Sequence, residues 1–201
     1  MERYDGLDAV PAQFGPSAVT IGKFDGVHVG HRAVLAQLHR VAEERRLLPV
    51  VVTFDRHPLA LLAPEKAPPA LVSLDQKLEL LAEAGVAATV VLPFDERLSK
   101  LPAEQFVEEV LGGRLHARAV LVGSDFRFGA KGAGNVETLR ELGPRNGFDV
   151  VLVDDVGIPD EEEPVHRASS TAIRQLLADG HPDDAANLLV HLQTVRSTVV
   201  H

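Results

Sequence analysis

Residues 22–31 form a glycine-rich stretch with two histidines, and their types and spacing indicate phosphate chemistry. Glycines let backbone N–H groups approach a phosphate, and the start of a following helix adds the positive end of its dipole. His28 and His31 are three residues apart, so on a helix they share one face and can hydrogen-bond a growing negative charge. We predict an anion site here. A helix start with surface histidines, and a two-histidine metal site with a third ligand elsewhere, are the alternatives.

A second candidate anion site spans residues 169–174, with the sequence Ser-Ser-Thr-Ala-Ile-Arg. Serine and threonine are favoured at the start of a helix, where several backbone N–H groups have no partner within the helix. Those N–H groups, the hydroxyls and Arg174 would converge on one point and suit a diphosphate or triphosphate. An ordinary helix cap with a surface arginine is the competing interpretation of this segment taken alone.

Residues 53–58 and residues 123–129 each place phenylalanine beside aspartate and a basic residue, directly after an apolar run. Phe126 and Phe128 alternate along a segment predicted to be extended, so we predict that they face opposite ways. One of them would stack on a planar ring while the other enters the core, and core packing is the alternative for both. Asp125 can accept a hydrogen bond from a ring N–H or simply begin a turn.

The elements that must position these four segments alternate between strand and helix. Apolar runs predict five strands, at residues 17–22, 48–54, 88–92, 119–123 and 148–153. Helical periodicity and capping signals predict helices at residues 31–46, 73–85, 102–111, 135–142, 170–179 and 183–189. A proline-rich loop is expected at residues 60–72. This order predicts an α/β fold: a doubly wound, mainly parallel five-stranded sheet with helices on both faces. Ligands bind such sheets outside the carboxyl ends of the strands.

Composition excludes several classes of protein. At 201 residues and 45% hydrophobic content, the chain can fold as one large domain with a sizeable core. It has no cysteine, which excludes disulfides, thiolate metal sites and cysteine nucleophiles. A formal net charge of −9 without a basic stripe argues against nucleic acid as a partner. The sequence has no apolar run of about 20 residues and no apolar signal core at its start, so we expect no membrane partner, no export and a cytoplasmic location.

Taken together and in this order, the four segments resemble the adenylyltransferase module of bacterial bifunctional FAD synthetases (riboflavin kinase/FMN adenylyltransferases). That family belongs to the nucleotidyltransferases with an H-x-G-H signature, which stands here at residues 28–31. The resemblance covers nearly the whole chain, from residue 18 to residue 189. It implies a Rossmann-like nucleotidyltransferase fold with ATP and FMN as small-molecule substrates. The implied reaction gives FAD and pyrophosphate, with Mg²⁺ accompanying ATP.

The resemblance also implies roles for individual residues. Contact with the triphosphate and stabilisation of the transition state are implied for His28, His31 and Arg174. Binding of the nucleotide and its phosphates is implied for Gly22, Phe24, Asp25, Gly30, Ser169, Ser170 and Thr171. The flavin side would be lined by Phe54, Asp55, His57, Pro58, Asp125, Phe126 and Phe128. No residue of the chain is implied as a metal ligand.

The carboxyl-terminal end departs from that family. Full-length members continue into a β-barrel riboflavin kinase module, and their Gly-Arg-Pro linker is replaced here by Val-His-Leu-Gln at residues 190–193. We expect residues 1–189 to form an FMN adenylyltransferase-like domain and residues 190–201 a tail resembling the start of the missing kinase module. We therefore expect no riboflavin kinase activity, and the altered linker favours a natural stand-alone enzyme. A lone strand at residues 195–200 would expose an edge through which a homodimer could form.

Two other functions stay open. A stand-alone paralogue could transfer a nucleotidyl group to a different phosphate monoester, because the fold does not decide the acceptor. A non-catalytic flavin- or nucleotide-binding protein would fit the loss of the kinase module, but it leaves the retention of both histidines and of residues 169–174 unexplained. The intact flavin side favours FMN as the acceptor over another phosphate ester.

Overall fold

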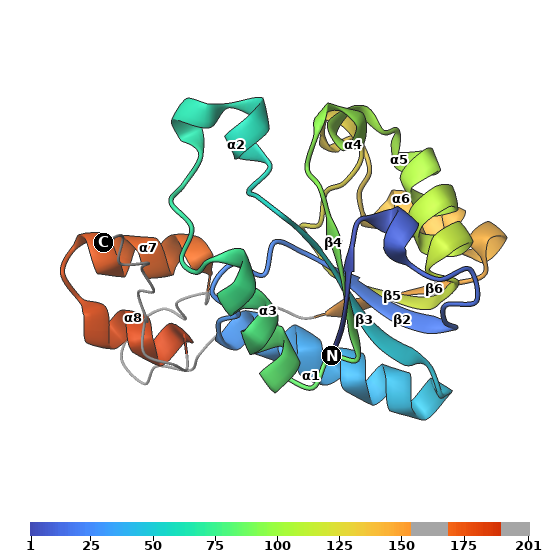
Figure 1. Cartoon of the computed structure of the whole chain (residues 1–201), viewed down its shortest axis with the longest axis horizontal. Coiled ribbons are helices and arrows are strands. Elements are labelled where there is room, and N and C mark those ends of the chain that lie inside the picture. Colours follow the sequence, from blue (N-terminus) through green and yellow to red (C-terminus); the bar gives the residue numbers. More distant parts are fainter. Residues whose placement is uncertain (154–168, 190–201) are drawn as a thin grey trace, which may run out of the picture.

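A parallel β-sheet of six strands forms the centre of the molecule in the computed structural model, which describes residues 1–153 and 169–189 (Figure 1). The strands are β1 (Glu2–Asp5), β2 (Ser17–Ile21), β3 (Leu48–Phe54), β4 (Ala88–Leu92), β5 (Ala117–Gly123) and β6 (Asp149–Val153). Their order is β1-β4-β3-β2-β5-β6, and every neighbouring pair is parallel. The chain moves outward from β2 through β3 and β4 on one side and through β5 and β6 on the other. The predicted doubly wound α/β fold is therefore confirmed.

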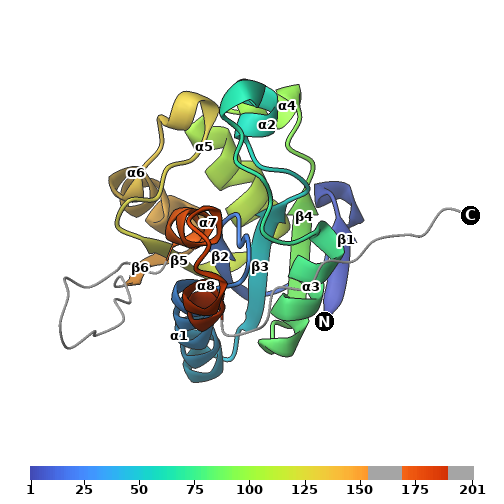
Figure 2. The same cartoon turned by 90° about the vertical axis from the view of Figure 1, so that its left-hand side faces the viewer.

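Helices cover both faces of the sheet. One face packs against α1 (Val29–Arg45) and α3 (Leu74–Glu83), and the other against the π-helix η3 (Phe106–Arg114) and α6 (Val136–Leu142) (Figure 1). Shorter helices are α2 (Leu59–Leu62), α4 (Glu96–Lys100) and α5 (Ala103–Gln105). The pair α7 (Ser170–Ala178) and α8 (Pro182–Leu189) lies beside the start of α1 (Figure 2). None of the described helices is both long and apolar enough to cross a bilayer.

The strands supply side chains alternately to two apolar cores. In β3, Val50 and Val52 belong to the core beneath η3 and α6, whereas Val51 belongs to the core beneath α1 and α3. All three side chains are fully buried. A strand covered on both faces favours apolar residues at nearly every position, and in β3 only Thr53 is polar, with its hydroxyl hydrogen-bonded to Lys23 O.

The sheet has one strand more than the five that the sequence predicts. Strand β1 lies at the edge beside β4, and its sequence Glu-Arg-Tyr-Asp is mostly exposed. The backbone of the neighbouring strand fixes it, since Glu2 N donates to Ala87 O and Gly6 N donates to Val91 O, both at 2.8 Å. An edge strand that buries so little has no apolar pattern, so hydrophobic periodicity could not predict it.

Some predicted elements have different bounds. The expected loop at residues 60–72 contains most of α2 and a short 3-10 turn, η2 (Pro64–Lys66). The helix predicted at residues 102–111 begins as α5 and continues as the π-helix η3 as far as Arg114. The capping box predicted at Ser73 and Gln76 is present at the start of α3. The predicted tail at residues 190–201, with its exposed edge, lies outside the described residues.

A third apolar cluster holds α7 and α8 against the loop that follows β2. Ile173 of α7 and Leu189 of α8 are buried in it together with Leu71. Gly26 of the loop has a φ of +83°, and an added Cβ would lie 2.9 Å from Leu189 Cδ2 and 3.1 Å from Leu71 Cδ1. Only glycine suits this position, because the backbone is left-handed and the helix pair packs directly on it.

We expect Gly26→Ala to lower the free energy of unfolding by about 2–3 kcal/mol, because it adds a steric contact to a left-handed backbone penalty of about 1–2 kcal/mol. Gly180→Ala is the matched control: its φ is +81°, and no atom lies within 4 Å of an added Cβ. It should carry the backbone penalty alone. Urea denaturation of both variants measures the difference. Equal losses would contradict the role assigned to the packing around Gly26.

Candidate functional site

Two cavities open at the carboxyl ends of the central strands. The larger, named here the histidine cavity, has a volume of about 980 Å³ and is lined by His28 and His31. The smaller, named here the phenylalanine cavity, has a volume of about 580 Å³ and is lined by Phe54, Phe126 and Phe128. The wall that they share is formed by Ile21, Gly22, Lys23, His57, Leu59, Asp125 and Phe126. Two ligands bound in the two cavities would meet at this wall.

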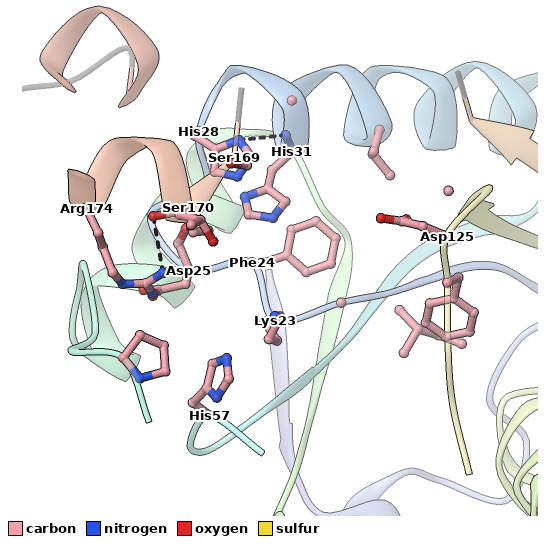
Figure 3. A pocket seen from close by; sticks show the side chains of 18 of the residues that line it. Lys23, Phe24, Asp25, His28, His31, His57, Asp125, Ser169, Ser170 and Arg174 are labelled. Carbon is pink, nitrogen blue, oxygen red and sulfur yellow. Dashed lines mark hydrogen bonds and ion pairs between the residues drawn. The ribbon is translucent and has the colours of Figure 1, made fainter. Parts of the chain in front are cut away.

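The structure brings the residues predicted for the nucleotide together in the histidine cavity, although their roles remain predictions. Its lining includes His28, His31, Arg174, Gly22, Phe24, Asp25, Gly30, Ser169, Ser170 and Thr171. Figure 3 shows the labelled members of this set around one space, with the start of α7 on one side and the histidines at the start of α1 on another. Asp25 and Ser170 are 145 positions apart in the sequence, so only the fold makes them neighbours.

The two histidines are stacked at the start of α1. His28 caps the helix, and its Nδ1 accepts a hydrogen bond from His31 N at 3.4 Å. The ring centroids are 3.7 Å apart with 25° between the planes, and the Phe24 ring lies 4.9 Å from that of His31. Because Nδ1 of His28 is an acceptor, the proton of the neutral ring is on Nε2. Because His28 caps the helix, α1 begins at Val29 rather than at the predicted residue 31.

Both histidines are neutral at pH 7. Burial lowers the pKa of His28 from 6.5 to about 4. Burial also lowers the pKa of His31 well below 6.5, and repulsion from a protonated His28 and from the charges of Lys23 and Lys77 acts in the same direction. Nδ1 of His31 is buried and has no hydrogen-bond partner in the part of the chain that the structure describes. Neutral imidazoles can still donate an N–H to an anion, so the pair can stabilise negative charge without being charged itself.

We expect the free energy of unfolding to fall as the pH drops from about 6.5 towards 4. In this window the unfolded chain binds protons at its histidines, whereas folded His28, with a pKa of about 4, does not. One such histidine contributes up to about 1.4 kcal/mol per pH unit. His28→Asn keeps an acceptor for the cap but does not titrate, so its stability should depend less steeply on pH. Urea denaturation between pH 4 and 7 tests this, and equal slopes for the two proteins would refute a neutral His28.

An ion pair joins the loop after β2 to helix α7. Asp25 Oδ2 pairs with Arg174 Nη2, and both side chains are largely buried. Arg174 also donates to Pro69 O at 2.7 Å and to Ser170 O at 3.1 Å, and Ser170 Oγ donates to Asp25 O at 3.0 Å. A buried ion pair is costly to break from one side. The guanidinium therefore positions α7, while its predicted contact with a phosphate stays a prediction.

Lys77 is a buried cation that was not among the predicted site residues. Its Nζ donates to Phe54 O at 2.8 Å, to Thr53 Oγ1 at 3.2 Å and to Lys23 O at 3.3 Å. Burial lowers its pKa to about 8, against the opposing effect of two nearby carboxylates. The ammonium thus ties together the chain segments that leave β2 and β3. A signal was available, since Lys77 follows Leu74 at helical spacing and precedes Leu81 by one turn, inside the apolar stripe of α3.

The rings of Phe126 and Phe128 stack on each other, which contradicts the prediction that they face opposite ways. Their centroids are 5.5 Å apart with 16° between the planes. The prediction was wrong because the segment turns instead of running straight: Phe126 N donates to Gly123 O at 3.2 Å, and Phe128 N donates to Gly134 O at 3.1 Å. Side chains alternate only along an extended strand. Both rings line the phenylalanine cavity.

Six of the seven predicted flavin residues line the phenylalanine cavity, namely Phe54, His57, Pro58, Asp125, Phe126 and Phe128. Asp55 does not. Its carboxylate accepts from Phe94 N at 2.8 Å and from the guanidinium of Arg56, and these bonds lower its pKa despite partial burial. Phe94 and Phe106 also line this cavity, although neither was predicted to do so. The Phe94 ring packs edge-on against that of Phe54, with 5.5 Å between the ring centroids. A signal was available for Phe94, which follows the predicted strand at residues 88–92 and stands beside Asp95, whereas Phe106 lies in a helical apolar stripe that is equally typical of the core.

A two-histidine metal site would need a third ligand beside His28 and His31, and residues 1–153 and 169–189 provide none. In that part of the chain no three His, Asp or Glu side chains are grouped in a way that could hold a metal ion. The stacked arrangement of His28 and His31 is instead that of a helix cap and its neighbour.

The fold and the two cavities define the class of protein. An anion site at a helix start, on the carboxyl edge of a doubly wound parallel sheet, is typical of nucleotide-binding α/β proteins. Residues 10–171 match the family model described as FAD synthetase. Because this match covers most of the chain, the chain belongs to the FAD synthetase family, and the resemblance carried by the four sequence segments is confirmed.

Curated relatives support the same family. The chain is 40% identical over 186 residues to a bifunctional riboflavin kinase/FMN adenylyltransferase of Escherichia coli K12, and 35% identical over 184 residues to one of Haemophilus influenzae. These matches cover 91% and 92% of this chain but 57% and 58% of the relatives, so the chain spans somewhat more than half of their length.

A solved structure is similar in fold. A protein from Streptococcus pneumoniae named macrolide-efflux protein matches with a TM-score of 0.81, over 96% of this chain and 72% of the other. The two sequences are 24% identical, so the likeness confirms the α/β fold and nothing about activity.

Proposed function

We propose that this chain transfers AMP from ATP to the phosphate of FMN, forming FAD and releasing pyrophosphate. The observation that carries the proposal is the wall shared by the histidine cavity and the phenylalanine cavity. A triphosphate suits the cavity with two helix starts and neutral imidazole donors, and a planar ring suits the cavity lined by phenylalanines. The phosphate of FMN would then lie at the wall, next to the α-phosphate of ATP. The names of the curated relatives support the same substrates.

The chemistry needs no nucleophile from the protein. A phosphate oxygen of FMN forms a bond to the α-phosphorus of ATP, and the bond from that phosphorus to the oxygen bridging to the β-phosphate breaks. Catalysis is then positioning and stabilisation of negative charge. His28 and His31 would donate N–H groups to phosphate oxygens, and residues 169–171 at the start of α7 would hold the departing pyrophosphate.

ATP would enter as its magnesium complex. Mg²⁺ usually keeps several waters and binds through substrate phosphates with one or two carboxylates. The carboxylate of Asp25 is already engaged by Arg174 and by Leu71 N, at 3.0 Å from the latter. We therefore expect the phosphates of ATP and water, rather than Asp25, to supply the ligands of the ion.

Incubation with Mg²⁺, ATP and FMN should give FAD and an equal amount of pyrophosphate. Riboflavin in place of FMN should give neither FMN nor FAD. Chromatography of the flavins with a coupled pyrophosphate assay measures both products. ATP binding without FAD formation would argue against FMN, and release of pyrophosphate with another phosphate ester would then favour the paralogue. ATP binding with no pyrophosphate from any ester would favour a non-catalytic binding protein.

His31→Ala should lower kcat for FAD formation by about 100-fold or more, as expected for the loss of one donor to a transition-state oxygen. The midpoint of thermal unfolding should stay close to that of the wild type, so the loss of kcat would not come from unfolding. His39→Ala is the control, because His39 lies on the same helix but hydrogen-bonds Ala84 O at 2.8 Å, outside both cavities. Full activity of His31→Ala would remove His31 from the mechanism.

A further inference from the structure

The wall between the two cavities contains one lysine or arginine among the described residues, and it is Lys23. Lys66 and Arg174 line the histidine cavity alone, and Arg127 and Lys131 line the phenylalanine cavity alone. A cation on the wall can reach ligands in both cavities, whereas each of the other four borders a single ligand.

Two cations near the wall are already engaged by oxygens of the protein, and the two histidines are neutral. The Arg174 guanidinium is held by Asp25, by Pro69 O and by Ser170 O. The Lys77 ammonium donates to three oxygens of the protein. Burial keeps the two histidines neutral. The charges of Arg174 and Lys77 are thus partly balanced by protein oxygens before any substrate binds.

Lys23 is fixed at its backbone and free at its tip. Its carbonyl oxygen accepts from Thr53 Oγ1 at 3.1 Å and from Lys77 Nζ at 3.3 Å. The next residue, Phe24, is buried and has a φ of 49°, a backbone conformation that is rare for a bulky side chain. The Lys23 side chain is exposed, and its ammonium has no hydrogen bond or ion pair within residues 1–153 and 169–189.

The charge of Lys23 acts on groups of both cavities. It contributes to lowering the pKa of His31, which lines the histidine cavity, and that of His57, which lies on the shared wall. Figure 3 shows Lys23 between Phe24 and His57. The ammonium therefore lies within electrostatic reach of the place where the two ligands would meet.

We propose that Lys23 is a catalytic residue that binds the acceptor phosphate and the α-phosphate of ATP together at this wall. The inference rests on the proposed function and deepens it by assigning a contact to both reacting groups. Two phosphates of like charge must approach while the bond from the acceptor oxygen to the α-phosphorus forms. A cation that touches both reduces their repulsion and stabilises the charge of the transition state. Lys23 keeps its proton, and the bridging oxygen of the departing pyrophosphate takes the electron pair of the broken bond.

The test compares three variants of the full chain with the wild type. Lys23→Met removes the charge but keeps a long side chain, and Lys23→Arg keeps the charge. Arg40→Met is the control, because it changes the net charge by the same amount from the exposed side of α1, away from both cavities. FAD formation with MgATP and FMN gives kcat and the KM of each substrate, and thermal unfolding monitors the fold.

We expect Lys23→Met to lower kcat by about 100-fold, with each KM changed by less than about fivefold and the unfolding midpoint unchanged. Lys23→Arg should retain at least about a tenth of the wild-type kcat, and Arg40→Met should retain all of it. If the wild-type protein makes FAD and the Lys23→Met variant has a similar kcat, this inference is overturned and the proposed function stands. A wild-type protein that makes no FAD would overturn both.

Discussion

The ion pair between Asp25 and Arg174 is the interaction on which the candidate site depends. The loop after β2 and the start of α7 each supply part of the lining of the histidine cavity, and neither encloses it alone. The pair, the bond from Ser170 Oγ to Asp25 O and the packing of the α7–α8 cluster on Gly26 hold these two segments together. A buried pair is tolerated when its remaining donors and acceptors are satisfied, which is why backbone groups of Pro69 and Leu71 complete it.

Electrostatics set the second constraint on the site. The chain carries a formal net charge of −9, so a polyanionic substrate can be received only where the local field differs from that of the whole molecule. The histidine cavity offers the starts of α1 and α7 and two uncharged imidazoles, together with an arginine, Arg174, whose charge is balanced by Asp25. Such groups favour phosphate binding without leaving a buried charge uncompensated in the empty protein.

Much of the fold could be predicted because buried strands and amphipathic helices leave periodic patterns. Apolar runs predicted the five strands β2 to β6. The sequence also predicted the capping box at Ser73 and the four segments at the carboxyl edge of the sheet. Strand β1 was not, because its stability comes from backbone bonds to β4 rather than from burial. The stacking of Phe126 on Phe128 was predicted wrongly, because a turn closed by distant backbone bonds replaces the assumed extended segment.

The sequence by itself determined most of the residues that form the candidate site and the family to which the chain belongs, because chemistry-bearing residues stand at fixed spacings directly after apolar runs. The tertiary structure alone decided how they are combined. It engaged Arg174 with Asp25, turned Asp55 away from both cavities, buried Lys77 beneath the segments after β2 and β3, and set Lys23 on the wall between the cavities. These outcomes depend on contacts between segments far apart in the chain, and local spacing holds no information about such contacts.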